Sequence, residues 1–303
     1  MTSVAEEAFR SRLLEAGLLV ESGADGVYLR SEVFFRLTGA IDEAISHAGS
    51  DMSATVLHLP PVMGREVLQR AEYVRSFPDL VGSVNIFDGD DGAHVELLDR
   101  LDHSKDWGET YVPSDVVLCS AGCHLLYPSC TGRLSGSGRV FEIFAHCFRR
   151  EPSRDPARMR SFLMHEFVYV GNPEGALSHR DTWLERAARL LSALGLAAEA
   201  VLATDAFFGR AGRLLSASQR AAALKHEIVA AVQPERGPMA VASSNYHLDH
   251  FGRCFDIRSA DGAPAHSACV GFASERIALA LLAHHGFDPK KWPTEVRQLL
   301  WPA

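Results

Sequence analysis

One segment, Phe148-Arg149-Arg150-Glu151, constrains the fold of this chain more than any other. It ends an apolar run and is followed by an arginine-rich loop, 152–160, and by a second apolar run, 162–170. This pattern predicts two neighbouring strands joined by a polar loop. Arg149 and Glu151 are two residues apart, so on a strand their side chains point to one face, which must be polar. That face suits a nucleotide, with a guanidinium on a phosphate and a carboxylate on an amine, but it also suits an edge strand with a surface ion pair.

A second segment, Gly271-Phe272-Ala273-Ser274-Glu275-Arg276, precedes an apolar helical pattern. Small residues before a helix let the backbone approach an anion, and Arg276 would add a fixed positive charge there. The alternative is an ordinary helix start, in which Ser274 caps the helix and Arg276 is solvated.

The rest of the chain alternates between helical and strand-like patterns. The expected helices are 4–18, 32–48, 66–77, 181–202 with Asp181 at its start, and a last helix that Gly286 ends. The expected strands are 55–63, 81–87 and, from Asp115 onward, the runs VVLC, GCHLLYP, RVFEIFAHCF and FLMHEFVYVG. We therefore expect an α+β fold in which helices flank a mixed, mostly antiparallel sheet, with residues 1–303 in one domain.

Charge and hydropathy exclude several classes of protein. The formal net charge of -8 argues against a protein whose affinity rests on neutralising many phosphates of a nucleic acid. No run of about 18 apolar residues occurs, and the N-terminal residues are acidic where a signal peptide would be basic and then apolar. We expect a soluble, cytoplasmic protein that has no membrane association.

The chain has six cysteines, and no two of them form a C-x-x-C pair. In a reducing compartment each should be a free thiol, which either fills a buried apolar site or binds a metal.

Taken together, the two charged segments resemble motifs 2 and 3 of the class II aminoacyl-tRNA synthetases. FRREPSRDPARMRSFLMHEF matches Phe-Arg-x-Glu with its loop and returning strand, and GFASER matches Gly-Phe-x-x-Glu-Arg before a long helix. The proline-bearing run VLHLPPVM resembles motif 1, which in that family forms the dimer interface, so the resemblance implies a homodimer. The pattern particularly resembles the archaeal, zinc-containing seryl-tRNA synthetases from about residue 30 onward.

The resemblance implies roles for the charged residues in binding ATP together with Mg²⁺. Arg149 would bind the α-phosphate, Glu151 the adenine amino group and Arg276 the γ-phosphate. Arg160 would also belong to the ATP site, and Phe167 would stack on the adenine. The three residues expected to be catalytic are Arg149, Glu151 and Arg276.

Further segments of the chain resemble the amino-acid pocket of the family. ATDAFFG and the stretch ending in SSNYH imply that Asp205, Ser244 and Asn245 line this pocket, together with Glu166. One departure affects magnesium: Met239 and Ala240 stand where the family usually has a magnesium-binding Glu.

The same resemblance implies a zinc ion that binds the substrate amino group. Cys123, Glu166 and Cys269 stand at the places of the family's ligands, and three protein ligands leave one position open. Cys130 is an alternative to Cys123. The other interpretation is a set of ordinary buried thiols and a hydrogen-bonded glutamate.

The residues before motif 1 form only a short helical extension, and no tRNA-binding module is recognisable. A synthetase-like chain of this kind resembles the bacterial amino acid:[carrier protein] ligases. These activate a small amino acid, typically glycine or alanine, and pass it to the phosphopantetheine thiol of a carrier protein, so no tRNA is expected as a partner. The basic residues Arg210, Arg213, Arg220 and Lys225 could dock an acidic carrier, or they could be solvated charges of a helix face.

Three other functions fit the same residues. The chain could be an aminoacyl-tRNA synthetase whose tRNA module is a separate chain, or a non-catalytic synthetase paralogue with a regulatory role. The retained Arg149, Glu151 and Arg276 argue against the paralogue. Transfer of the activated amino acid to a small amine is the third alternative.

Overall fold

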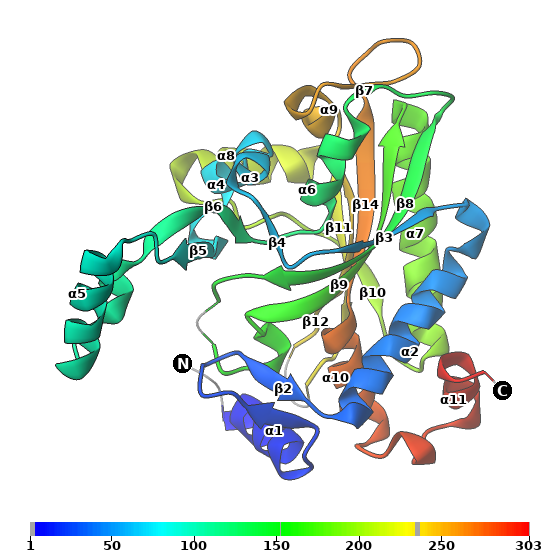
Figure 1. Cartoon of the computed structure of the whole chain (residues 1–303). Helices are drawn as coiled ribbons and strands as arrows, with labels where there is room; N and C mark the ends of the chain where they lie inside the picture. The colour runs from blue at the N-terminus through cyan, green and yellow to red at the C-terminus, as the bar shows by residue number, and fades with distance from the viewer. Residues whose placement is uncertain (1–3, 152, 234–236, 303) are drawn as a thin grey trace.

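The computed structural model describes residues 4–151, 153–233 and 237–302, and a seven-stranded sheet forms its centre (Figure 1). Every neighbouring pair of strands is antiparallel except β3 and β8, which are parallel. In spatial order the strands are β10 (Glu199–Leu202), β11 (Lys225–Ala230), β12 (Met239–Tyr246), β14 (His266–Ala273), β9 (Ser161–Gly171), β8 (Gly138–Phe148) and β3 (Thr55–Leu59). The predicted mixed, mostly antiparallel sheet flanked by helices is confirmed.

Strands β8 and β9 form the long hairpin that the sequence predicted. They pair along eleven residues each, from Gly138 opposite Gly171 to Phe148 opposite Ser161. Gly138 has a φ of 151°, and a Cβ there would lie 2.6 Å from the Val170 carbonyl oxygen, so this close approach requires glycine.

Three helices cover one face of the sheet: α2 (Glu32–Ala48), α7 (Pro173–Ala193) and α10 (Ser274–His285). Helix α2 has the predicted bounds, and the Ser31 side chain caps it by accepting from the Phe34 N–H. Helix α7 differs from the prediction, because it begins at Pro173 and not at Asp181. Asn172 caps it and Pro173 occupies its first turn, while 199–202, expected to end the helix, forms β10.

Smaller elements cover the opposite face. They are α3 (Arg65–Arg70), α4 (Tyr73–Ser76), α6 (Cys123–Leu126), α9 (His250–Cys254) and a sheet of β4 (Val62–Gly64), β6 (Val112–Leu118) and β5 (Ser83–Ile86). Helix α8 (Gly209–Ala221) begins beside α4, where the Phe208 N–H donates to the Ser76 carbonyl. The helix expected over 66–77 is broken at Glu72, whose φ is 56°. The strand expected at GCHLLYP is instead the short helix α6, followed by a 3-10 turn.

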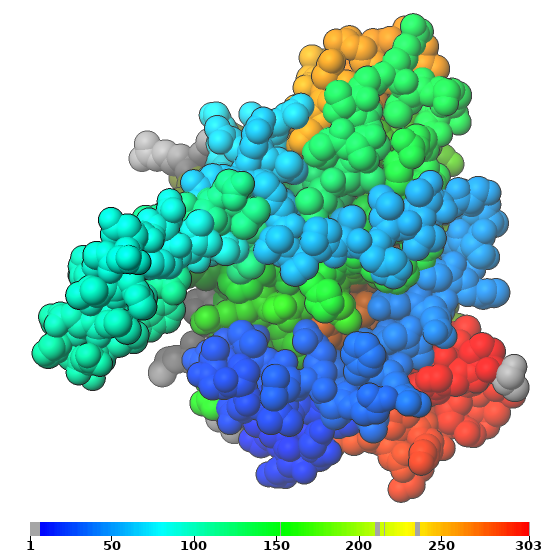
Figure 2. All heavy atoms as spheres, viewed as in Figure 1, coloured from blue at the N-terminus to red at the C-terminus, as the bar shows by residue number. Residues whose placement is uncertain are grey.

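Helix α5 (Asp91–Asp102) belongs to an arm that extends away from the body, at the left of both views (Figures 1 and 2). The sequence predicted no helix here; Asp90 caps α5 by accepting from the Ala93 N–H. None of the residues of α5 is buried.

The remaining elements lie at the ends of the chain and in connections. They are α1 (Val4–Glu15), β1 (Leu19–Glu21), β2 (Tyr28–Arg30), β7 (Gly132–Arg133), β13 (Ile257–Arg258) and α11 (Thr294–Leu300). Among the described residues, no helix combines the length and the apolar character that a membrane crossing needs.

Candidate active site

The face of the sheet away from α7 carries the candidate active site, and the period of two along each strand decides which side chains reach it. Met164 and Glu166 are two residues apart on β9, and Glu166 is paired with Gly271 on β14. Cys269, two residues before Gly271, is paired with Asn245 on β12. Residues in register across an antiparallel pair share a face, so the central strands converge here on one face.

A pocket at one end of this face brings together the charged residues of the two sequence motifs. Arg149, Glu151 and Arg276 all line it, with Phe162 and Met164 as apolar walls. The Arg149 guanidinium lies 5.3 Å from the centroid of the Phe162 ring. These contacts give the pocket fixed positive charge beside an aromatic face, an arrangement suited to a nucleotide.

Backbone carbonyls fix the two arginines. Arg149 Nε donates to the Ser120 carbonyl at 3.3 Å. Arg276 donates from Nε to the Ala157 carbonyl at 2.7 Å and from Nη1 to the Ala240 carbonyl at 3.0 Å. Ala240 is one of the two residues expected at the place of a magnesium-binding Glu, and here its backbone carbonyl orients an arginine.

Burial lowers the pKa of Arg276, and the neighbouring positive charges of Arg149 and Arg158 lower it further, against the opposing effect of Glu151. Glu151 forms an ion pair with Arg158, at 3.0 Å between Oε2 and Nη1. Two arginines and two glutamates line the pocket, but Glu151 is paired with Arg158 and Glu275 with Arg30. Arg149 and Arg276 can therefore take up the charge of an anionic ligand.

Glu275, for which the sequence predicted no role, also lines the pocket. Its two carboxylate oxygens accept from the Leu163 N–H at 2.9 and 2.8 Å, and it forms an ion pair with Arg30 at 2.7 Å. Glu275 therefore holds the start of α10 against β9, which positions the adjacent Arg276.

Two predicted site residues, Phe167 and Ser244, lie on the face of the sheet opposite the pocket. Phe167 is fully buried against Trp183, at 4.4 Å between ring centroids, and Ser244 is fully buried with its hydroxyl donating to the Arg180 carbonyl. Both face α7, because they are an odd number of residues from the site-facing positions of their strands. Phe162 lines the pocket in place of Phe167, and Ser243 shares the face of Asn245.

Arg160 is not among the residues that line the pocket. Its backbone accepts from the Arg149 N–H and donates to the Gly26 carbonyl, at 2.9 and 2.8 Å. Arg160 therefore contributes to the site through its backbone, which holds the backbone of Arg149 in place.

The other end of the face brings together Cys123, Glu166 and Cys269, as predicted for a metal site. Their donor atoms all lie within 4.8 Å of one another, and all three residues are buried. The Gly122 N–H donates to Glu166 Oε1 at 2.8 Å, which fixes the carboxylate. Cys130, the alternative to Cys123, is not part of this group and lies 4.0 Å from the Ser129 hydroxyl.

The protonation of these groups favours a bound cation. Burial, with the nearby Cys269, raises the pKa of Glu166 to about 7. The hydrogen bond to Cys269 and burial raise the pKa of Cys123, whereas that bond and His247 lower the pKa of Cys269. Three buried acidic groups cannot all ionise unaided, so a divalent cation would be needed to hold them deprotonated.

His247 is a second residue that sequence reasoning missed. Its Nε2 lies 3.6 Å from Cys269 Sγ, and its Nδ1 lies 3.0 Å from the Ser267 hydroxyl. Asn245, which was predicted, donates from Nδ2 to the same Cys269 sulfur at 3.6 Å. His247 and Asn245 therefore both contact the Cys269 sulfur of the candidate metal site.

Asp205 lies near the site but is bound by internal partners. Lys225 Nζ contacts it at 2.5 Å and the Gln219 amide donates to it at 2.7 Å. These partners outweigh burial and lower the pKa of Asp205. Lys225 is therefore not free to dock a carrier; Arg213 and Arg220 are exposed on α8, and the Arg210 side chain lies outside the described residues.

Comparison with solved structures identifies the fold. The chain superposes on the M. kandleri seryl-tRNA synthetase, solved in complex with A. aeolicus tRNASec, with a TM-score of 0.80 and 20% identity over 99% of this chain and 60% of that one. Together, the fold and the two converging motifs define a class II aminoacyl-tRNA synthetase-like protein. No protein-family model matches the chain.

Two relatives in Bradyrhizobium diazoefficiens identify the family. Amino acid–[acyl-carrier-protein] ligase 2 is 39% identical over 289 residues, which cover 95% of this chain and 86% of the relative. Ligase 1 of the same organism is 38% identical over 281 residues, covering 92% and 86%. The chain belongs to the amino acid–[acyl-carrier-protein] ligase family.

Proposed function

We propose that this enzyme activates a small amino acid with ATP and transfers it to the phosphopantetheine thiol of a carrier protein. Ligation of an amino acid to an acyl-carrier protein is the activity that the names of its relatives state. The single observation that carries the activation step is the pocket in which Arg149, Glu151 and Arg276 meet beside Phe162.

In the first step, a carboxylate oxygen of the amino acid attacks the α-phosphorus of ATP. The bond to the β-phosphate oxygen breaks, pyrophosphate leaves and the aminoacyl-adenylate forms. Arg149 and Arg276 neutralise the phosphate charge from positions that backbone carbonyls have fixed, so little reorganisation is needed. Glu151 would accept from the adenine amino group, and the Phe162 ring would pack against the base.

ATP would enter with Mg²⁺, as in the class II synthetases. The Ala240 carbonyl, which stands in place of a magnesium-binding carboxylate, contacts Arg276. We infer that the protein's arginines take a larger share of the phosphate charge here.

Cys123, Glu166 and Cys269 would hold a zinc ion, since two thiolates and one carboxylate suit its ligand preferences. When bound, zinc would offer its open position to the α-amino group of the substrate. The surroundings are tightly packed: a Cβ on Gly122 would lie 2.8 Å from Glu166 Oε1 and 2.9 Å from Ala145 Cβ. This packing supports a small substrate, glycine or alanine.

In the second step, the phosphopantetheine thiol of the carrier loses its proton to solvent, and its sulfur attacks the carbonyl carbon of the adenylate. AMP leaves, its phosphate taking the electron pair of the broken bond, and a thioester forms. The exposed Arg213 and Arg220 on α8 would dock the acidic carrier.

Further proposals concern assembly and setting. A homodimer would form through α2 and β3, because β3 is an edge strand of the sheet and Val56 on it is exposed. The net charge of -8 supports the proposal that tRNA is not a substrate. Free thiols as zinc ligands favour the reducing cytoplasm.

The test of activation is ATP–pyrophosphate exchange measured with each amino acid. Exchange with glycine or alanine is expected, and Arg276→Gln should abolish it. Arg139→Gln, an exposed arginine near the other end of β8, is the matched control and should retain exchange. Absence of exchange with every amino acid would favour a non-catalytic paralogue and overturn the proposal.

A further inference from the structure

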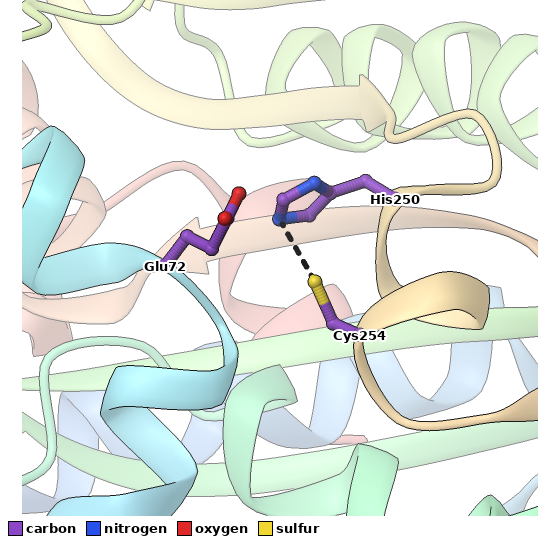
Figure 3. Close-up of side chains that lie close together, drawn as sticks. All are labelled: Glu72, His250 and Cys254. Carbon is purple, nitrogen blue, oxygen red and sulfur yellow. Dashed lines mark hydrogen bonds between the residues drawn. The ribbon is translucent and has the colours of Figure 1, made fainter.

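A second group of potential metal ligands lies outside the site described above. Glu72, His250 and Cys254 each offer one donor atom, and these atoms lie within 4.8 Å of one another. Figure 3 shows that the three side chains point toward a common position. The proposed reaction uses none of them.

Two separate parts of the fold supply this group. Glu72 lies between α3 and α4 in the left-handed backbone region, with a φ of 56°. His250 and Cys254 are four residues apart on α9, so their side chains share one side of the helix. The three residues line a surface pocket that His247 and Asp249 also border.

The arrangement differs from that of a nucleophilic cysteine with a histidine base. In such a relay the base contacts the nucleophile with one ring nitrogen and the orienting carboxylate with the other. Here Cys254 Sγ lies 3.8 Å from His250 Nε2, and the Glu72 carboxylate faces the same edge of the ring (Figure 3). Three donor atoms within 4.8 Å of one another are close enough to share one cation.

His250 Nε2 lies 3.8 Å from Cys254 Sγ and 3.4 Å from the Ala71 carbonyl oxygen, but neither contact involves the Glu72 carboxylate. Among the residues that the structure describes, no cation forms an ion pair with Glu72, although its carboxylate is directed at the other two donors. A divalent cation would satisfy all three residues at once.

We propose that Glu72, His250 and Cys254 form a second metal site, which binds Zn²⁺ or a similar divalent transition metal. Thiolate, imidazole and carboxylate are all zinc ligands, and the open pocket leaves room for water as a fourth. Because Glu72 is exposed and the other two residues are half-buried, this site should exchange its metal with solvent faster than the buried one.

The position of the site gives the bound metal a structural consequence. Zinc there would join the turn before α4 to α9, and α9 begins three residues after His247. His247 in turn contacts Cys269 of the buried site. The second metal would therefore fix the loop that carries His247.

The first test uses alkylation of Cys254 by iodoacetamide, with zinc alone as the probe. Of the six cysteines only Cys254 is not buried, so labelling of the folded protein reports on it. Zinc should slow labelling at least tenfold in the wild type and have little effect in His250→Gln. His94→Gln, an exposed histidine on the arm, is the matched control and should retain the protection. If zinc leaves the wild-type labelling rate unchanged, the proposal is wrong.

The second test counts zinc per chain after gel filtration in zinc-containing buffer. We expect two equivalents in the wild type and one in each of Cys254→Ser and Cys269→Ser. If only the buried-site proposal fails, the wild type will hold one equivalent and Cys254→Ser none, which still supports the second site. Equal zinc in Cys254→Ser, His250→Gln and the wild type would overturn it.

Discussion

The Arg149 guanidinium lies over the Phe162 ring, 5.3 Å from its centroid, and both residues line the candidate nucleotide pocket. The arginine follows the end of β8 and the ring lies near the start of β9, so the polar loop between the strands brings them together. The site therefore depends on which residue of β9 faces the pocket.

Phe162 and Phe167 provide a direct test of that dependence. Phe162→Ala should raise the KM for ATP about tenfold, because contact between an aromatic side chain and a base contributes about 1–3 kcal/mol. Phe167→Ala should instead lower the free energy of unfolding by about 3–5 kcal/mol through a core cavity, with little change in KM for ATP. Pyrophosphate exchange and urea unfolding measure the two effects. If instead Phe167→Ala raised the KM for ATP and Phe162→Ala did not, the adenine would stack on Phe167.

The cysteines separate the proposed metal ligands from buried thiols. Cys269→Ser should lose the tightly bound zinc and raise the KM for the amino acid at least tenfold, since the loss of a ligand weakens the grip on the substrate amine. Cys130→Ser, which alters a buried thiol outside the group, should retain the bound zinc and the wild-type KM for the amino acid. Elemental analysis and exchange kinetics provide the readouts. A Cys269→Ser enzyme with full zinc and normal KM would contradict the ligand assignment.

His165 should make stability depend on pH. It is buried between Asp42, 3.3 Å from Nδ1, and Glu142, 3.0 Å from Nε2. Burial alone would lower the pKa of His165, but the two carboxylates outweigh it and raise the pKa above its ordinary 6.5. The native state therefore holds this proton more tightly, and the stabilisation is complete below 6.5 and lost as pH rises through the folded-state pKa.

His165→Gln should accordingly cost about 3 kcal/mol at low pH, because it leaves buried carboxylates without their cation. Urea unfolding at about pH 6 and about pH 9 should show a larger loss at the lower pH. A loss that is equal at both would show that His165 is neutral in the native state.

Carrier docking is tested by reversing charge on α8. Arg213→Glu combined with Arg220→Glu should raise the KM for the carrier protein about tenfold and leave pyrophosphate exchange unchanged, since both residues are exposed. Arg189→Glu on α7, which packs on the opposite face of the sheet, is the matched control. Equal effects of the two substitutions would place the docking surface elsewhere.

Much of the fold and the core of the site could be predicted from sequence. The bounds of α2 and the β8–β9 hairpin follow from apolar periodicity, which tertiary packing here reinforces. Arg149, Glu151 and Arg276 meet in one pocket, and the three predicted metal ligands lie together.

The predictions that differ from the structure share a physical cause. The face of the sheet on which a side chain lies, and the residues at which a helix begins and ends, depend on tertiary packing. Phe167 and Ser244 were assigned from the family resemblance, but a shift of one position along a strand moves a side chain to the other face. His247 is 22 residues from Cys269 in sequence, and only the pairing of β12 with β14 brings their side chains together. Helix α5 was not predicted because it has no buried apolar face to give a helical pattern of hydrophobic residues.

The most direct test of the central claim is transfer of a labelled amino acid. The enzyme is incubated with ATP and labelled glycine or alanine, together with a carrier protein in its phosphopantetheinylated form, the same carrier without that group, or tRNA. Label should appear only on the phosphopantetheinylated carrier, as a thioester that hydroxylamine cleaves. Label on tRNA and none on either form of the carrier would contradict the account.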